Sequence, residues 1–588
     1  MSFEPFVFKQ NRKKAIRTLG GKYGKFITDK KRENVEILET LKEQHSDDES
    51  LIAINQIENE LTSKKYGLVW EEHEEEVDVK MRTHIPVFTE VEAKEIVGAS
   101  ESEQYNFLLE GDNLHSLKLL EKTHKGKIDV IYIDPPYNTG NKDFKYDDTF
   151  VDKLDSYKNS KWLSFMWSRL KVAHKLLSSE GIIFISIDDN ELYPLKMICD
   201  EIFGEQCFVT NLIWQKKTGA SDAKGIATIT EYILVYVKDY AVMDSVFDKN
   251  YEAFDAKRYR YKDEYFNERG PFYYDSLDRG SVRYSDTLNY SIKSPNGDDI
   301  YPNGRKNFEN DGWTWKWSKE KVEWGIRNGF IDITPSSKKE NGWAVRYKIY
   351  LNVDNENRPI EKSAPYKNLI TTILNANAAA DIKKMFNGKT VFQYSKPVGL
   401  MGFLLSCEKN KKALILDFFA GSGTTGQAVL EKNMEDGGNR HFILCTNNEN
   451  NICEEVTYQR LKTVITGKCA DGSQYSEGLP ANLKYYKTDF VDKESEEIYD
   501  DLLEHTKEMI QLQYGVKVDN QKYIMIMDDD EMDEFEKHFD EFKDIEVVFI
   551  NQDVLLSTSQ EKLLQNINTK IIPDCYFDFE LREVGELW

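Results

Sequence analysis

The chain of 588 residues is 40% hydrophobic and has a mean hydropathy of −0.60, as is typical of a protein that folds in water. Its length is too great for one core and predicts roughly three or four domains. No run approaches the roughly 18 apolar residues of a membrane span, and the first residues lack the apolar segment of a signal peptide. Seven cysteines without a CxxC pair indicate reduced thiols, so we expect a cytoplasmic protein with no membrane contact and no metal site.

The net charge of −24 is concentrated at the C-terminal end. Residues 491–588 hold 27 acidic and 9 basic side chains, a net of −18, which leaves −6 for the first 490 residues. Residues 211–370 hold 26 basic and 24 acidic side chains. The acidic end is therefore expected to face a protein partner or solvent, and another region remains free to meet a polyanion such as nucleic acid.

Residues 1–95 are expected to form an appended helical region. Leu51, Ile54, Ile57 and Leu61 recur at helical spacing. This pattern favours a helix hairpin packed on the main body over a dedicated partner-binding element.

A short apolar strand, residues 107–109, then leads into Gly111, Asp112 and Asn113 and a helix with leucines on one face. An acidic residue at a strand end, beside a tight glycine turn, can accept a hydrogen bond from an adenine amino group or a ribose hydroxyl. By itself, an acidic residue such as Asp112 at this position more often caps the helix that follows it.

The next stretch, KIDVIYIDPPYNTGN, carries the strongest chemical signal. Its apolar run, residues 128–133, predicts a buried parallel strand, and ligands bind beyond the carboxyl ends of such strands. Asp134, Pro135, Pro136 and Tyr137 follow at that end. The prolines stiffen the turn and remove two backbone donors, which leaves acceptors only. A carboxylate beside carbonyl oxygens suits a guest with two N–H bonds to donate, such as a nucleobase amino group, and Tyr137 can stack on its ring.

Further α/β elements follow this turn. Residues 162–177 predict an amphipathic helix, and residues 181–191 a second buried strand that ends in acidic residues. This order implies parallel crossover units. Residues 211–214 and 232–237 are expected to form a strand pair that closes this half of the sheet.

A long insertion, residues 238–375, changes the pattern. Residues 211–370 contain 6 of the 10 tryptophans and 15 of the 32 tyrosines, interleaved with Arg and Lys in segments such as KRYRYKDEYF and WTWKWSKEKVEW. Such aromatics suit contacts with bases and backbone, and they equally suit the core of a small β-rich domain. For single residues the core interpretation is favoured, whereas the insertion as a whole is typical of a target-recognition domain.

A second motif, KKALILDFFAGSGTTGQAVLEKN, predicts a strand over residues 413–416, a Gly421-Ser422-Gly423 turn and a helix that begins at Thr424. Glycines let a ligand approach the backbone, and a helix N-terminus offers N–H groups to a carboxylate. The third glycine of a dinucleotide fold is missing. Lys383 stands where a phosphate loop ending in Gly388-Lys389-Thr390 would need its first glycine, so no triphosphate motor is expected.

Taken together, Asp134-Pro135-Pro136-Tyr137 and the later DxFxGxG motif resemble the amino-methylating DNA methyltransferases. The resemblance implies a Rossmann-like α/β sheet that binds S-adenosyl-L-methionine, in the permuted β-class order. The domains implied are a helical region (1–95), a catalytic half (96–237), a target-recognition domain (238–375), a cofactor half (376–490) and an acidic α/β module (491–588). For the acidic module, subunit contact and a solvated surface are equally favoured.

The resemblance also assigns site residues. The catalytic set is Asp134, Pro135, Pro136 and Tyr137. The segment VFQYSKPVG resembles the family's F-x-Y-P-K-P, with Ser395 in place of the usual proline. The implied cofactor-binding residues are Asp112, Lys396, Pro397, Asp417, Phe419, Gly421, Gly423, Thr424, Thr425 and Glu449.

More narrowly, EGDNLHSLKLL, HKGKIDVIYIDPPYNTGNKDFKYDD and ISIDDNE resemble the modification (Mod) subunits of type III restriction-modification systems. This resemblance implies a homodimeric adenine methyltransferase associated with the nucleoid. It would act on one strand of an asymmetric sequence in double-stranded DNA, beside a separate restriction (Res) subunit. A solitary adenine or cytosine 4-amino methyltransferase and, more remotely, a non-catalytic DNA-binding subunit remain alternatives.

The resemblance implies a mechanism for this site. The target adenine swings out of the stack, Asp134 and the Pro135 carbonyl accept its two amino hydrogens, and Tyr137 stacks on the base. The amino nitrogen then attacks the methyl group without a covalent enzyme intermediate.

Overall fold

The computed structural model describes residues 70–586 except 99–103, 141–143, 147–148, 153–154, 220–224, 252, 254, 281–283, 393 and 519. The chain divides into two compact units, Met1–Glu71 and Glu72–Trp588. The helical pattern predicted over residues 51–61 lies outside the described residues.

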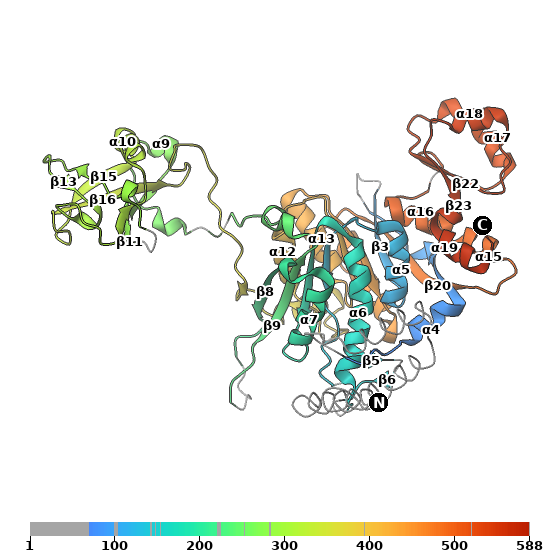
Figure 1. The fold of residues 1–588 in the computed structure, drawn as a ribbon. Coiled ribbons are helices and arrows are strands. Elements are labelled where there is room, and N and C mark those ends of the chain that lie inside the picture. The colour runs from blue at the N-terminus through green and yellow to red at the C-terminus, as the bar shows by residue number, and fades with distance from the viewer. Residues whose placement is uncertain are drawn as a thin grey trace, which may run out of the picture. The chain divides into compact units, whose positions relative to one another are not determined.

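A large, mostly parallel sheet forms the centre of the second unit (Figure 1). Its strands follow one another in the order β1 (His84–Glu90), β20 (Asn482–Asp492), β3 (Tyr105–Glu110), β19 (His441–Thr446), β18 (Leu414–Asp417), β4 (Ile128–Ile133), β7 (Leu177–Ile187), β9 (Thr230–Val237), β8 (Phe208–Gln215) and β17 (Leu369–Ile370). The strands from β20 to β7 are parallel neighbours, and β9 runs antiparallel between β7 and β8. The predicted Rossmann-like α/β class is thereby confirmed.

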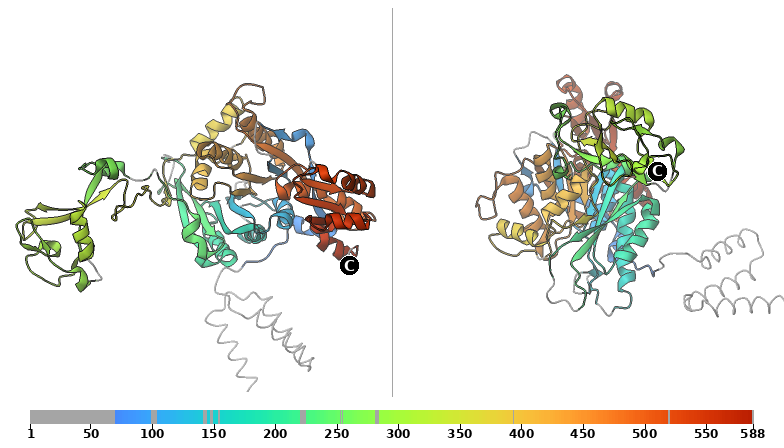
Figure 2. Two further views of the ribbon diagram at one scale, coloured as in Figure 1. Left: turned by 90° about the horizontal axis from the view of Figure 1, so that it is seen from above. Right: turned by 90° about the vertical axis from the view of Figure 1, so that its left-hand side faces the viewer.

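Helices cover the two faces of this sheet. One set consists of α5 (Asn113–His124), α6 (Lys158–Leu176) and α7 (Leu192–Phe203), which pack against one another in that order. The other set consists of α12 (Val398–Ser406), α13 (Thr424–Asp436) and α14 (Gln459–Thr466), which lie on the opposite face (Figure 2). Because helices cover both faces of the sheet, the central strands consist of continuous apolar runs rather than of alternating apolar and polar residues. Strand β4, for example, is buried at five of its six positions.

The permuted order brings distant segments together. Strand β18 pairs with β4 through Ile415 and Val130, and β19 pairs with β3 through Thr446 and Glu110. Because these strands are parallel, their carboxyl ends meet at one edge of the sheet. The turns that follow them therefore lie side by side.

The first part of the described chain differs from the predicted helical region. Helix α4 (Glu76–Thr83) is followed by β1, which pairs antiparallel with β20, and by β2 (Ile96–Val97), which also pairs with β20. The helical prediction is wrong for β1, since the partner of this strand lies about 400 residues away and no local pattern reveals it.

The insertion builds a small core of its own. One antiparallel sheet has the order β10 (Phe272–Ser276), β16 (Trp343–Tyr350) and β15 (Ile331–Pro335). Two further strand pairs are β11 (Asp278–Gly280) with β14 (Trp313–Trp315) and β12 (Ile292–Lys293) with β13 (Asp299–Ile300). The helices of this region are α8 (Met243–Val246), α9 (Phe266–Arg269) and α10 (Lys319–Arg327).

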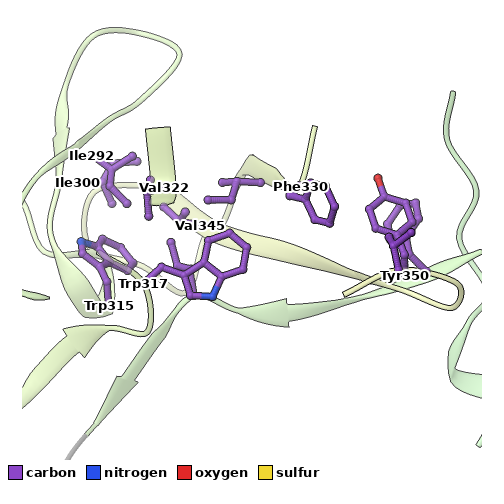
Figure 3. Packing of buried hydrophobic residues seen from close by; sticks show 12 residues of the cluster. Ile292, Ile300, Trp315, Trp317, Val322, Phe330, Val345 and Tyr350 are labelled. Carbon is purple, nitrogen blue, oxygen red and sulfur yellow. The ribbon is translucent and has the colours of Figure 1, made fainter. Parts of the chain in front are cut away.

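Aromatic side chains fill this core. Trp315 and Trp317 lie close to Ile292, Ile300 and Val322, as Figure 3 shows. Phe330 packs on the ring of Tyr350 with a centroid separation of 5.1 Å. The core interpretation is therefore correct for these aromatics. The insertion also ends earlier than residue 375, because β17 rejoins the central sheet beside β8 and α11 (Ala376–Met385) follows it.

The acidic end forms a second, smaller α/β layer. Its parallel sheet has the order β21 (Tyr523–Ile526), β22 (Val547–Asn551) and β23 (Thr569–Ile572). Its helices are α15 (Ile498–Glu504), α16 (Thr506–Tyr514), α17 (Asp529–Lys537), α18 (Thr558–Leu564) and α19 (Asp574–Val584). Among the described residues, no helix combines the length and the apolar character that crossing a membrane would need.

Candidate active site

The turn after β4 is held rigidly from two sides. Trp162 of α6 donates its indole N–H to the Pro136 carbonyl at 2.6 Å. Asn138 is fully buried in a left-handed conformation, with a φ of 55°, and donates from Nδ2 to Oε1 of Glu191 at 2.7 Å. Residues 134–137 therefore have little freedom to shift, as a preorganised acceptor site requires.

The hydroxyl of Tyr137 points toward Asp134, the acidic residue of the same DPPY motif. The phenol donates to Oδ1 of Asp134 at 2.9 Å, and Oε2 of Glu231 lies 3.2 Å from the same oxygen. Burial, followed by the charges of Asp134 and Glu231, raises the pKa of Tyr137 well above its usual value, so the hydroxyl keeps its proton. The hydroxyl fixes the orientation of both the ring and the carboxylate.

Lys396 lies in the middle of this group. Its Nζ donates to the two carboxylate oxygens of Asp134 at 2.7 and 2.8 Å and to the Tyr137 hydroxyl at 2.8 Å. Oε2 of Glu231 is 3.5 Å away, and the other oxygen of Glu231 accepts from Lys216 at 2.7 Å. Lys396 is predicted from the sequence to bind the cofactor, yet the structure places its amine on the carboxylate of the predicted catalytic motif.

Charge pairing explains why this lysine stays ionised although it is almost buried. Burial works to lower the pKa of Lys396, but the nearby Asp134 and Glu231 outweigh it and raise the pKa. For Glu231, burial works to raise the pKa, and Lys396 and Lys216 bring it below its usual value. The two lysines and the two acids therefore form one cluster, in which two ammonium groups pair with two carboxylates.

The glycine turn after β18 has the geometry that the motif predicts. Gly421 and Gly423 adopt φ values of 48° and 77°, which disfavour any side chain. A Cβ on Gly423 would approach Cγ2 of Thr457 to 3.1 Å. The turn opens helix α13, whose first N–H groups face the edge of the sheet where β4 also ends.

Asp417 closes the base of that turn. Its two oxygens accept from the Phe419 N–H at 3.0 Å and from the Thr425 hydroxyl at 2.6 Å. Burial raises the pKa of Asp417 to about 7, although both hydrogen bonds oppose the shift. Asp417 and Thr425 thus support the turn, and the ring of Phe419 packs on that of Phe165 with a centroid separation of 5.8 Å.

Two consecutive residues connect the two motifs. The Ser395 hydroxyl lies 2.9 Å from the Ser422 hydroxyl and 3.0 Å from that of Thr424, in the glycine turn. The next residue, Lys396, reaches Asp134. Pro397 then forms the N-cap of α12. The carboxylate of the first motif and the turn of the second therefore belong to one site.

The two outlying cofactor candidates stand at the ends of neighbouring strands. Asp112, after β3, caps α5 by accepting from the Leu114 N–H at 2.7 Å, so the capping interpretation is correct. The adjacent Asn113 donates to the Phe418 carbonyl at 2.8 Å, which ties this turn to the glycine motif. Glu449, after β19, is partly exposed and lies 3.0 Å from Nζ of Lys145. Lys145 belongs to the hairpin of β5 (Lys145–Tyr146) and β6 (Thr149–Phe150).

The sequence interpretation missed Glu231 and Lys216. Glu231 stands near the start of an otherwise apolar strand, TEYILVYV, and a lone acid in such a run is the signal that could have revealed it. Lys216 comes directly after β8, which is the antiparallel partner of the strand that contains Glu231. In the described portion of the chain, no group of three or more His, Cys, Asp or Glu side chains is placed to hold a metal.

The sequence model of a family described as DNA methylase matches residues 128–458, more than half of the chain. The chain belongs to the DNA methylase family. The matched range of this methylase runs from β4 through the glycine turn and past Glu449 to residue 458, and Asp112 lies before it.

Curated relatives of the methylase are of two kinds. The Mod subunit of the type III restriction-modification enzyme StyLTI from Salmonella typhimurium is 33% identical over 395 residues, 62% of this chain and 56% of that protein. The corresponding EcoPI Mod subunit of Escherichia phage P1 is 29% identical over 58% of each chain. The type II methyltransferase M.KpnI from Klebsiella pneumoniae is 32% identical over 65% of this chain and 90% of that protein. The match thus spans little more than half the length of the type III relatives.

Proposed function

We propose that this DNA methylase transfers a methyl group from S-adenosyl-L-methionine to the 6-amino group of adenine in a short asymmetric DNA sequence. In this proposal it is the modification and recognition subunit of a type III restriction-modification system. The observation that carries the proposal is the bridge of Ser395 and Lys396, which puts the Asp134 carboxylate and the 421–423 turn in one site.

The residues at this edge of the sheet fit the proposed methyl donor. The glycines at 421 and 423 permit close approach, and helix α13 offers its N-terminus to an anion. Asp112 and Glu449 stand at neighbouring strand ends, where acids can accept from hydroxyl or amino groups. The donor, when bound, supplies an electrophilic methyl group on a sulfonium.

The protein's own part in the reaction follows from the acceptor geometry. Asp134 and the Pro135 carbonyl accept the two N–H bonds of an extruded adenine, which withdraws the nitrogen lone pair from conjugation with the ring. Tyr137 offers its ring face to the base. Asp134, an anion, also stabilises the positive charge that the nitrogen gains and holds the proton that it loses. These roles require no covalent bond between enzyme and DNA.

Several finer statements belong to the same proposal. The insertion with its own aromatic core serves as the target-recognition domain, and residues 258–262, RYRYK, carry exposed Arg258, Arg260 and Lys262 toward the DNA backbone. The chain acts as a homodimer in the bacterial cytoplasm, associated with the nucleoid, and a separate restriction subunit binds it. The acidic module of residues 491–588 supplies a subunit contact.

A solitary methyltransferase is the second candidate function, because the match covers 90% of M.KpnI. Sequencing modified bases in DNA from cells that express the chain separates the candidates. The proposal predicts N6-methyladenine on one strand of an asymmetric site. N6-methyladenine on both strands of a palindrome supports the solitary enzyme, N4-methylcytosine supports the cytosine alternative, and unmodified DNA contradicts a catalytic role.

A further inference from the structure

Asn138, the residue directly after the DPPY motif, forms a buried pair with Glu191. Asn138 has no exposed surface, and Glu191, which stands at the N-cap of α7, is 1% exposed. Nδ2 of Asn138 donates to Oε1 of Glu191 at 2.7 Å and to the Lys158 carbonyl at 3.2 Å. Both hydrogens of the amide are therefore used, and they connect the turn of residues 134–137 to the first residues of α6 and α7.

Each side chain of this pair also has one buried oxygen that lacks a donor. Among the described residues, neither Oδ1 of Asn138 nor Oε2 of Glu191 has a hydrogen-bond partner. A buried polar atom without a partner costs free energy, so folded proteins contain few of them. The two atoms belong to side chains that one hydrogen bond already joins. A single additional hydrogen between the two side chains could therefore satisfy both oxygens.

The surroundings of Glu191 favour such a hydrogen. Burial, the largest influence, raises the pKa of Glu191 to about 7, and the charge of Asp188 acts in the same direction. The hydrogen bond from Asn138 and the charge of Lys158 oppose the shift. Asp188 faces Glu191 from the end of β7, and Lys158 faces it from the start of α6. Because burial outweighs these influences, the carboxyl group gains stability when it takes up a proton.

We propose that Glu191 is a positioning residue that holds a proton on Oε2 and forms two hydrogen bonds with the Asn138 carboxamide. Nδ2 of Asn138 donates to Oε1, and the acid hydroxyl of Glu191 donates to Oδ1. The pair fixes the segment that follows Tyr137 and, through it, the acceptor oxygens of residues 134 and 135. This inference rests on the proposed function, because it concerns the geometry in which those acceptors meet the target amino group.

The expected effect on catalysis follows from this proton. When Glu191 ionises, the hydroxyl donor is lost and Oδ1 of Asn138 again lacks a partner. One hydrogen bond instead of two then joins the pair, so the acceptors are held less firmly and kcat falls. The KM for S-adenosylmethionine should stay constant, since the pair lies behind the DPPY turn rather than at the 421–423 turn.

Glu191→Gln tests the proposal, because the amide of glutamine reproduces the hydrogen bonds of the neutral acid. At every pH its oxygen can accept from Nδ2 of Asn138 and its nitrogen can donate to Oδ1. The assay is methylation of unmethylated genomic DNA by the full chain at saturating S-adenosylmethionine, between pH 6 and pH 8.5. We expect the kcat of the variant to equal that of the wild type at pH 6. At pH 8.5 it should be higher by about fivefold, as for the loss of one hydrogen bond in the wild type.

Two further variants accompany this assay. Asp189→Asn is the matched control, because it removes an exposed carboxylate only two residues before Glu191. The ratio of its kcat to that of the wild type should not change with pH. Glu191→Ala provides neither the donor nor the acceptor and should lower kcat at every pH.

Melting temperatures provide a measurement that needs no catalysis. The folded pKa of Glu191 lies above its ordinary value of 4.5, so the proton contributes stability that is present below pH 4.5 and is lost as the pH rises through about 7. The melting temperature of Glu191→Gln minus that of the wild type should therefore increase from pH 6 to pH 8.5. The corresponding difference for Asp189→Asn should stay constant.

Three results would overturn the proposal. A melting-temperature difference for Glu191→Gln that does not change with pH shows that Glu191 holds no proton. Identical pH profiles of kcat in Glu191→Gln and the wild type show that the proton does not position the turn. A loss of kcat in Glu191→Gln at pH 6 as large as in Glu191→Ala shows that the turn needs the carboxylate instead.

Failure of the proposed function is distinguishable from these results. If neither the wild type nor any variant methylates DNA at any pH, the proposed function and the positioning role fail together. The melting temperatures still decide in that case whether Glu191 holds the proton.

Discussion

The ammonium group of Lys396 lies 2.7 and 2.8 Å from the two carboxylate oxygens of Asp134 and so occupies the acceptor that the proposed mechanism assigns to the target amino group. A cation at this place also repels the positive charge that develops on the attacking nitrogen. Lys396 must therefore change partner before methyl transfer. Oε2 of Glu231, 3.5 Å away, is the carboxylate already positioned to receive it.

Glu231→Gln is expected to lower kcat about tenfold or more, because the lysine then loses its alternative anion and holds Asp134 more firmly. The amide oxygen of Gln can still accept from Lys216, whereas the amide nitrogen takes the place of the oxygen near Tyr137 and Lys396 and cannot accept from either. Steady-state methylation assays and calorimetric titration with S-adenosylhomocysteine check this, and cofactor affinity should stay near that of the wild type. Unchanged turnover in Glu231→Gln would show that Lys396 needs no second carboxylate.

Tyr137 has two separable roles, stacking and hydrogen bonding. Tyr137→Phe loses the 2.9 Å bond to Asp134 but keeps the ring, so we expect activity to fall by no more than about tenfold. Tyr137→Trp should likewise keep much of the activity, whereas Tyr137→Ala removes the stacking surface and should lose far more. Single-turnover rates of the three variants check the order. A loss in Tyr137→Phe as large as in Tyr137→Ala would make the hydroxyl, rather than the ring, the catalytic feature.

Asp417 predicts a pH dependence of stability. Its folded pKa of about 7 lies above the ordinary value of 3.8, so folding favours the protonated acid. The corresponding stability is present below pH 3.8 and is lost as the pH rises toward 7. Asp417→Asn removes this loss, and its oxygen can still accept one of the two hydrogen bonds. The difference in melting temperature, variant minus wild type, should therefore be larger at pH 8 than at pH 5. A constant difference across that range contradicts the raised pKa.

The exposed basic run at residues 258–262 should bind DNA phosphates. Replacing Arg258, Arg260 and Lys262 with Gln is expected to weaken DNA binding and to flatten its salt dependence, by about 0.9 in the log–log slope for each phosphate-binding side chain that is neutralised. Fluorescence anisotropy at several salt concentrations measures this. Replacing the exposed Lys543, Lys562 and Lys570 of the acidic module with Gln is the matched control. Equal slopes in both triple variants would remove this run from the DNA interface.

Local sequence was sufficient to predict the central elements. The run at residues 128–133 and the glycine turn at 421–423 form the expected strand and turn, since apolar continuity and glycine act over a few residues. The meeting of the two motifs could also be expected, because parallel strands present their carboxyl ends at one edge.

Other features depend on partners that are distant in the sequence. The edge strand β1 forms because it pairs antiparallel with β20, and no pattern within residues 84–90 predicts that pairing. The position of the Lys396 amine is likewise set by acids at 134 and 231, which belong to other strands. The family resemblance assigned Lys396 to the cofactor site. Only the folded sheet shows that its amine contacts the carboxylate of Asp134 and lies near that of Glu231.

The central claim is that the Asp134 carboxylate accepts the amino group of adenine beside a bound methyl donor. Its most direct test is to incubate DNA that contains the recognition site with S-adenosylmethionine and either wild type or Asp134→Ala, and to quantify methylated nucleosides by mass spectrometry. The account predicts N6-methyladenine with the wild type and at least about a hundredfold less with Asp134→Ala, while the variant binds S-adenosylhomocysteine and DNA as before. Turnover by Asp134→Ala near the wild-type rate would contradict it.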